Sequence, residues 1–174
     1  AISIYGEPDF LAIKDQNEIK EKKNSINKKE YYLINNIDEI DSWIKDAEEV
    51  GEVAVDTETS SLDPHQANLI GISLSSVLGK ACYIPIGHKS KKNMDKNLVL
   101  EKLKPLLEDP SIQKIGQNIK FDFIVFFKQG IEITSMEDTM LMSYVLDAGK
   151  NRHNMDTLAE IHLGHKTIAF KDLV

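Results

Sequence analysis

The chain is poor in cysteine and in long apolar runs. Cys82 is its single cysteine, which excludes a disulfide framework and a zinc site built on cysteines. Its longest uninterrupted apolar run, Phe123–Phe127, is far shorter than the roughly 20 residues of a membrane helix. We therefore predict no association with a membrane, and a location in the reducing cytoplasm.

Positive charge is also scarce relative to negative charge, and the formal net charge is −7. This balance argues against a protein that holds nucleic acid through a broad positive surface. Any phosphate chemistry must then be confined to a local site that neutralises its own charge. The five histidines show no ligand spacing with a cysteine, so we interpret them as structural or surface residues. The basic run His88–Lys96 is typical of a solvated loop.

The composition is that of an ordinary globular domain. Of its 174 residues, 41% are hydrophobic and 28% are charged. A domain of this length buries about 70% of the surface of its unfolded chain. Residues 1–30 are rich in lysine and have little apolar periodicity, so we predict a polar N-terminal arm or interdomain linker there. We predict the folded domain over residues 31–174.

Apolar periodicity predicts a sheet that is flanked by helices. Strands are expected at Tyr31–Ile34, Val53–Glu58, Leu69–Ser76, Ala81–Gly87 and Ile112–Gly116. Helices are expected from a cap at Asn36 to Val50, over Asn97–Pro110 with a bend or break at Pro105, from a cap at Asn118 to Gly130, and near Asp138 and Asn154. Strands first and alternating helices and strands later indicate an α/β fold with a mixed sheet.

The stretch VAVDTETSSLD, Val53–Asp63, places two carboxylates on one predicted strand. Side chains two positions apart on a strand point to the same face, so Asp56 and Glu58 would lie about 6.5 Å apart at their Cα atoms. Hard carboxylate oxygens at that separation can bind one or two ions such as Mg²⁺ or Mn²⁺.

The Asp-x-Glu pattern by itself is weak, since chance gives about half a match in a chain of this length. Asp46 and Glu48 repeat the pattern on a predicted helix, where the two side chains diverge and cannot share an ion. Only Asp56 and Glu58 have the strand geometry. The alternative is that they are solvated acids at the end of a strand.

A third carboxylate, Asp122, follows in the stretch IGQNIKFDFIVFF. One interpretation is structural, because an acid in the first turns of a helix that Asn118 caps is favoured by the helix dipole. The other starts from its apolar neighbours, among which an unpaired charge is costly. A bound metal ion would relieve that cost.

Four stretches occur in a fixed order: VDTETSSLD, GQNIKFD, DTMLMSYVLD and RHNMDTLAEIHLGHKTIAF. Together they resemble the 3′–5′ exonuclease (proofreading) domain of bacterial DNA polymerase I, a member of the DEDD exonuclease group. The resemblance extends over about Tyr31–Val174. It implies a ribonuclease-H-like fold, two Mg²⁺ or Mn²⁺ ions held by four carboxylates, and hydrolysis of the 3′-terminal phosphodiester of DNA.

The resemblance also implies roles for single residues. Asp56 would bridge both ions, Glu58 would bind the ion that activates water, and Asp122 would hold the second ion. Residues near the bound single strand would be Leu62, Asn118, Phe121, Arg152 and Phe170. The implied partners are the 3′ end of single-stranded DNA and a polymerase domain in the same parent chain.

The chain departs from the family pattern at the fourth carboxylate, which belongs to a Tyr-x-x-x-Asp or His-x-x-x-x-Asp motif beyond HKTIAF. No such motif occurs there, so we expect the third motif to be absent and this chain to have little activity. Two alternatives stay open. One is an inactive module with a structural or single-strand-binding role, and the other is an unrelated α/β hydrolase of phosphate esters.

Overall fold

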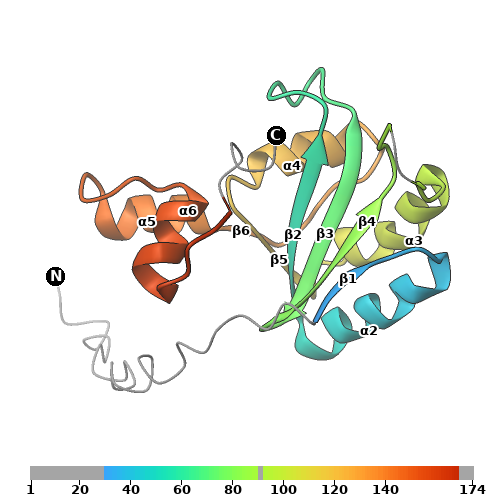
Figure 1. The fold of residues 1–174 in the computed structure, drawn as a ribbon, viewed down its shortest axis with the longest axis horizontal. Helices are drawn as coiled ribbons and strands as arrows, with labels where there is room; N and C mark the ends of the chain where they lie inside the picture. Colours follow the sequence, from blue (N-terminus) through green and yellow to red (C-terminus); the bar gives the residue numbers. More distant parts are fainter. Residues whose placement is uncertain (1–29, 90–91, 169–174) are drawn as a thin grey trace, which may run out of the picture.

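A computed structural model describes residues 30–89 and 92–168. These residues form a six-stranded sheet in the order β1-β4-β3-β2-β5-β6 (Figure 1). The strands are Tyr31–Leu33 (β1), Glu52–Thr59 (β2), Leu69–Val77 (β3), Lys80–Pro85 (β4), Gln113–Gly116 (β5) and Met136–Asp138 (β6). The predicted arm over residues 1–30 lies outside the described residues, except for Glu30.

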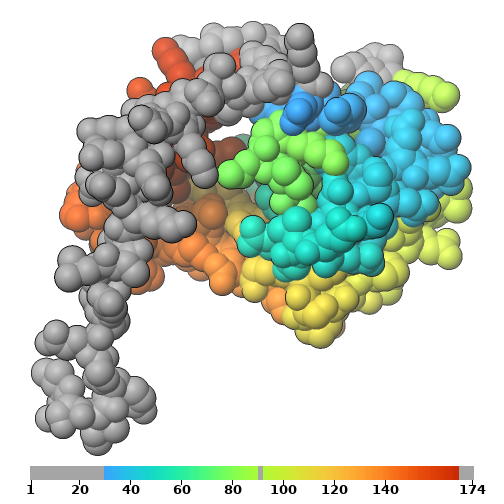
Figure 2. All heavy atoms as spheres, turned by 90° about the horizontal axis from the view of Figure 1, so that it is seen from below, coloured from blue at the N-terminus to red at the C-terminus, as the bar shows by residue number. Residues whose placement is uncertain are grey.

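In the described residues, helical segments follow β1, β4, β5 and β6. They are Ile37–Glu39 (η3), Ile40–Val50 (α2), Lys96–Glu108 (α3), Lys120–Phe127 (α4), Thr139–Asp147 (α5), Met155–Leu158 (α6) and Ala159–Leu163 (η4). In the described part of the chain, no helix is long and apolar enough to span a bilayer. Helix α5 lies at the opposite end of the molecule from α2, as two views at right angles show (Figures 1 and 2).

The sheet is mixed. Strand β3 runs antiparallel to both β2 and β4, whereas the pairs β1–β4, β2–β5 and β5–β6 are parallel. Tight turns can join antiparallel neighbours, but parallel neighbours need a crossover, which α4 supplies between β5 and β6. This topology confirms the predicted α/β fold with a mixed sheet.

Strand β2 lies inside the sheet, and its side chains point alternately to a buried face and to an open face. Val53, Val55 and Thr57 are buried, whereas Ala54 and Glu58 are exposed, as the two-residue period of a strand requires. Side chains of α2, α3 and α4 pack with Val53 and Val55 in one apolar core. Each large apolar side chain in that core contributes roughly 1.5–3 kcal/mol to folding. The face that carries Asp56 and Glu58 is therefore the one turned away from the core.

Most helix ends agree with the predicted signals. The Asn36 side chain caps the first turn by accepting from the Asp38 N–H, and Gly51 ends α2 with a φ of 80°. Of the bend or break predicted at Pro105, the break does not occur, because α3 continues through this residue to Glu108. Asp138 caps α5, as predicted, by accepting from the N–H groups of Met140 and Leu141.

The predicted cap at Asn118 is wrong. Asn118 has a φ of 58°, in the left-handed region, and α4 begins two residues later at Lys120 without a side-chain cap. The N–H of Asn118 instead donates to the Asp138 carboxylate at 2.9 Å. Helix α4 ends at Phe127, and Gly130 closes the turn that follows.

Candidate active site

Strand β2 holds Asp56 and Glu58 on the open face of the sheet. Asp56 is half-buried and pairs across the sheet with Ser73, while Glu58 is exposed and pairs with Gly71. The two carboxylates therefore have the same-face arrangement that the sequence predicts.

Helix α4 brings Asp122 to the same strand. Only 3% of Asp122 is exposed, and its Oδ1 accepts hydrogen bonds from the Thr57 backbone N–H at 2.9 Å and the Thr57 hydroxyl at 2.6 Å. Thr57 is the residue between Asp56 and Glu58, so these bonds fix Asp122 against the middle of the carboxylate pair. The cost of burying this charge is relieved, at least in part, by Thr57.

Asp56 is repelled by the other two acids. Burial, followed by the charges of Asp122 and Glu58, raises the pKa of Asp56 from 3.8 to about 6. Burial also raises the pKa of Asp122, and the two hydrogen bonds from Thr57 oppose that rise. A cation at this end of β2 would stabilise the ionised carboxylates.

The donor set suits a hard divalent cation, because it consists of carboxylate oxygens on a half-buried surface. Among the described residues, however, no three acidic, histidine or cysteine side chains converge closely enough to hold one ion. The Oδ1 atom of Asp122 is turned toward Thr57. The chemistry of the site thus fits Mg²⁺ or Mn²⁺, although these side chains do not close a complete set of ligands.

The other predicted site residues fall in three places. Leu62 follows β2 and is 97% exposed, and Asn118 lies in the turn before α4. Phe121, in the first turn of α4, is half-buried and packs against the core. Arg152 is exposed in the loop before α6. Phe170 lies outside the described residues.

The loop that contains Arg152 is connected to the segment before α4. The Gln117 side chain donates to the carbonyl of His153 at 2.7 Å, and the Thr139 hydroxyl bonds to Gln117 at 2.5 Å. The imidazole of His153 bonds to Ser143 at 2.7 Å. These contacts keep the Arg152 loop beside the segment that carries Asn118.

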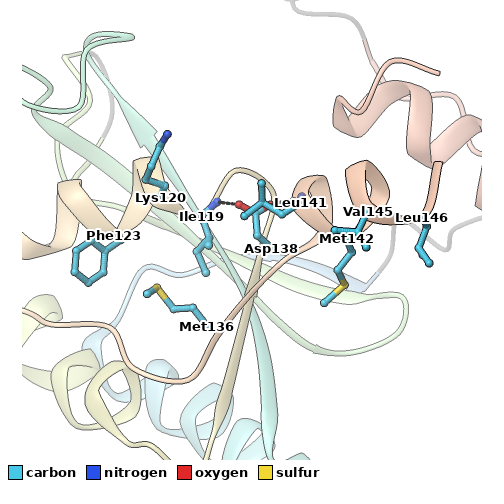
Figure 3. A pocket seen from close by; sticks show the side chains of 9 residues that line it. All are labelled: Ile119, Lys120, Phe123, Met136, Asp138, Leu141, Met142, Val145 and Leu146. Atoms are coloured by element: carbon cyan, nitrogen blue, oxygen red, sulfur yellow. Dashed lines mark hydrogen bonds between the residues drawn. The ribbon is translucent and has the colours of Figure 1, made fainter. Parts of the chain in front are cut away.

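Sequence reasoning missed two residues that organise this region. Thr57 fixes Asp122, and the only signal for it was a hydroxyl between two acids. Asp138 has a second role besides capping α5, since it also accepts hydrogen bonds from the N–H groups of Asn118 and Ile119 at 2.9 and 3.1 Å. Figure 3 shows the bond from Ile119. The single carboxylate of Asp138 therefore joins the turn before α4 to the start of α5.

An apolar groove of about 710 Å³ lies between α4, β6 and α5 (Figure 3). Lys120 and Phe123 line it from α4, while Leu141 and Val145 line it from α5. Asp122 points from a different face of α4, toward β2. The groove is therefore separate from the carboxylates.

Comparison with known proteins identifies relatives over most of the chain. Residues 31–174 match the protein family described as 3′–5′ exonuclease. DNA polymerase I of Rhizobium leguminosarum is 41% identical over 163 residues, which cover 82% of this chain and 16% of that protein. DNA polymerase I of Pseudomonas aeruginosa is 44% identical over 139 residues, which cover 76% of this chain and 15% of that protein. The chain thus spans about a sixth of the length of these relatives.

Solved structures of other proteins have a fold similar to that of this chain. Brucella melitensis NrnC with bound Mg²⁺ is 27% identical with a TM-score of 0.58, over 80% of this chain and 62% of that one. A second structure of NrnC, bound to pGG, has a TM-score of 0.59 at 28% identity and covers 80% of this chain and 61% of that one. Escherichia coli RNase D, at 20% identity, has a TM-score of 0.64 over 83% of this chain and 36% of that one. The likeness to RNase D shows the fold alone and confirms the predicted ribonuclease-H-like architecture.

Proposed function

The chain belongs to the 3′–5′ exonuclease domain family of DNA polymerase I, and on that basis we propose that it hydrolyses the 3′-terminal phosphodiester of a DNA strand. The product is a nucleoside monophosphate. The observation that carries this proposal is the pair of hydrogen bonds from Thr57, the residue between Asp56 and Glu58 on β2, to Asp122 of α4. Thr57 and Asp122 are 65 positions apart in the sequence.

The ions proposed for this site are Mg²⁺ or Mn²⁺, two in a complete site. Asp56 would contact both, Glu58 would hold the first, and Asp122 would hold the second. When bound, such ions lower the pKa of an attacking water and stabilise the leaving oxygen. The raised pKa of Asp56, which is caused by burial and then by the charges of Asp122 and Glu58, supports a role in cation binding. The Mg²⁺ complex of the similar NrnC supports the choice of ion.

The proposed substrate is the 3′ end of a single strand. Leu62, which follows Glu58 by four residues and is 97% exposed, would pack against the terminal base. Asn118 and Arg152 would contact the strand from the two connected segments. Phe121 and Phe170 are the remaining candidates for contact with bases. The pGG complex of NrnC supports a nucleic acid ligand.

A polymerase domain in the same parent chain is the proposed partner, because the matched relatives are DNA polymerases I that are about six times longer than the matched region. Helix α5 has no buried residue and exposes Leu141, Val145 and Leu146 at 57%, 84% and 78%. Such a face is suited to packing against another part of the parent chain. Slower hydrogen exchange of α5 in a longer form of the protein would support this. A cytoplasmic location is also proposed, on the basis of the lone Cys82.

The decisive experiment measures release of monophosphate from a 3′-labelled single strand with Mg²⁺ or Mn²⁺. The 174-residue chain provides three of the four carboxylates, so we expect slow hydrolysis or none from it alone. An extended form that also carries a C-terminal Tyr-x-x-x-Asp motif should cleave one nucleotide at a time from the 3′ end. Asp56→Ala should abolish this activity, whereas Asp46→Ala, on α2, should not.

An inactive module that binds single strands is the second candidate. It is favoured by the incomplete set of ligands among the described residues. The two candidates are separated by the extended form. If it folds, carries the motif, binds a single strand and still releases no monophosphate, the exonuclease proposal fails and the binding module replaces it.

A further inference from the structure

We infer that Tyr83, held by His88, positions the carboxylate of Glu58. This inference rests on the proposed function and adds two residues to its site. Glu58 is exposed, and its side chain forms no hydrogen bond or ion pair with another residue in the described part of the chain. A metal ligand in that state is free to rotate, so a neighbouring group is needed to orient it.

The strand register places Tyr83 on the same face as the carboxylates. Asp56 of β2 pairs with Ser73 of β3, and Ser73 pairs with Tyr83 of β4. Directly paired residues of neighbouring strands point to the same side of a sheet. Tyr83 therefore lies on the open face, two strands away from Asp56.

The Tyr83 ring crosses the intervening strand in the direction of Glu58. Gly71 is the cross-strand partner of Glu58, and a Cβ atom built on Gly71 would lie 1.9 Å from the Tyr83 hydroxyl oxygen. The hydroxyl thus occupies the space that a side chain at Gly71 would fill. Burial, followed by the charge of Glu58, raises the pKa of Tyr83, which agrees with this closeness.

His88 holds the Tyr83 hydroxyl through a hydrogen bond. Its Nε2 atom lies 2.6 Å from the Tyr83 oxygen, and the two rings meet edge to face with centroids 5.7 Å apart. The backbone of His88 is itself held, because its N–H donates to the Asn93 side chain at 2.7 Å and its carbonyl accepts from that side chain at 2.7 Å. The preceding Gly87 donates to the Ile70 carbonyl at 2.9 Å.

The donors and acceptors of His88, Tyr83 and Glu58 allow one chain of hydrogen bonds, from His88 to Tyr83 and from Tyr83 to Glu58. When Nε2 of His88 carries its proton and donates to the Tyr83 oxygen, the phenol proton is free for a second acceptor. An ionised carboxylate is the strongest acceptor on this face. Tyr83 can then donate to Glu58 and limit its rotation. Residues that hold a metal ligand in this way typically change metal affinity or activity by about 10–100-fold when they are removed.

The test uses the 174-residue chain with ¹³C-labelled glutamate. Tyr83→Phe removes only the hydroxyl, and His88→Gln removes the imidazole if the first variant fails to fold. Tyr144→Phe is the matched control, because Tyr144 contacts His153 in another part of the molecule, with ring centroids 3.9 Å apart and the rings tilted by 34°. We expect the carboxyl signal of Glu58 to move in the first two variants and to stay in place in the control. An unchanged Glu58 signal in a folded Tyr83→Phe chain overturns the inference.

A second measurement gives the size of the effect. Tyr83→Phe should weaken the binding of Mn²⁺, followed by electron paramagnetic resonance, by about tenfold. The same change in a Glu58→Gln background should have no further effect, whereas equal weakening in both backgrounds contradicts a role through Glu58. Neither the carboxyl signal nor the Mn²⁺ measurement requires nuclease activity. A failure of the extended form to cleave DNA would therefore overturn the proposed function without deciding the role of Tyr83.

Discussion

Replacing Asp56 with asparagine should stabilise the fold at neutral pH. The pKa of Asp56 rises from 3.8 to about 6 because of burial and the charges of Asp122 and Glu58. A rise of that size corresponds to about 3 kcal/mol, and solvent screening of the half-buried carboxyl reduces this to about 1–2 kcal/mol. Asparagine keeps the shape of the side chain and removes the unfavourable charge. The free energy of unfolding at pH 7 should therefore rise by about 1–2 kcal/mol in Asp56→Asn.

The direction in which stability changes with pH follows from the raised pKa of Asp56. Between pH 3.8 and about 6, the folded chain binds more protons at Asp56 than the unfolded chain does. Stability of the wild-type protein therefore falls as the pH rises through this window. The advantage of Asp56→Asn should be largest above pH 6 and should vanish near pH 4, where Asp56 is protonated in the folded state and in much of the unfolded state.

Urea unfolding at several pH values, with chelator present, measures this effect directly. Glu52→Gln is the matched control, because Glu52 lies on the same strand and is exposed, and its change should stay within about 0.5 kcal/mol. Addition of Mg²⁺ should stabilise the ionised carboxylate of the wild-type protein. The difference in the free energy of unfolding between wild type and Asp56→Asn should therefore become smaller. A loss of stability in Asp56→Asn at pH 7, or a gain that does not depend on pH, would refute the reasoning.

Three further substitutions test other contacts, and each cost below is a loss in the free energy of unfolding, measured with urea. Thr57→Val removes the hydroxyl donor to buried Asp122 and should cost about 1–3 kcal/mol, while Thr57→Ser should recover most of the loss; equal losses would mean that the hydroxyl does not stabilise Asp122. Gly71→Ala should cost about 1–3 kcal/mol through the clash with Tyr83, and a smaller cost in a Tyr83→Ala background is expected; equal costs in both backgrounds would exclude that clash. Asp138→Ala should cost about 2 kcal/mol or more, because it removes the cap of α5 together with two other backbone bonds; a loss below 0.5 kcal/mol would contradict both roles.

The parts of the fold that depend on local signals were predictable. Two-residue alternation located β2 within one residue at each end, and Gly51 and Asp138 marked helix boundaries correctly. The same local rules failed at Asn118. Its side chain is a favoured cap, but a carboxylate 20 positions later binds its backbone N–H and the residue takes a left-handed conformation. No local pattern contains that information.

In the candidate site too, features that depend on local sequence were predictable and features that depend on distant contacts were not. The same-face geometry of Asp56 and Glu58 follows from β periodicity alone. The approach of Asp122 to Thr57 requires the docking of α4 on β2, which no periodicity specifies. The position of Tyr83 depends on strand register across two neighbours, and sequence reasoning had placed His88 among the structural or surface histidines.

The order of strands in the sheet has a consequence for folding kinetics. Strands β2, β3 and β4 pair with their neighbours in the sequence, whereas β5 joins β2 only through pairs such as Glu52 with Gln113. Closing long loops costs entropy before the contacts form, so the β2–β3–β4 meander should form early. Asp56 and Glu58 would then be in place before α4 arrives with Asp122. The repulsion between Asp122 and Asp56 would act only on the late docking step, and divalent cations should speed that step.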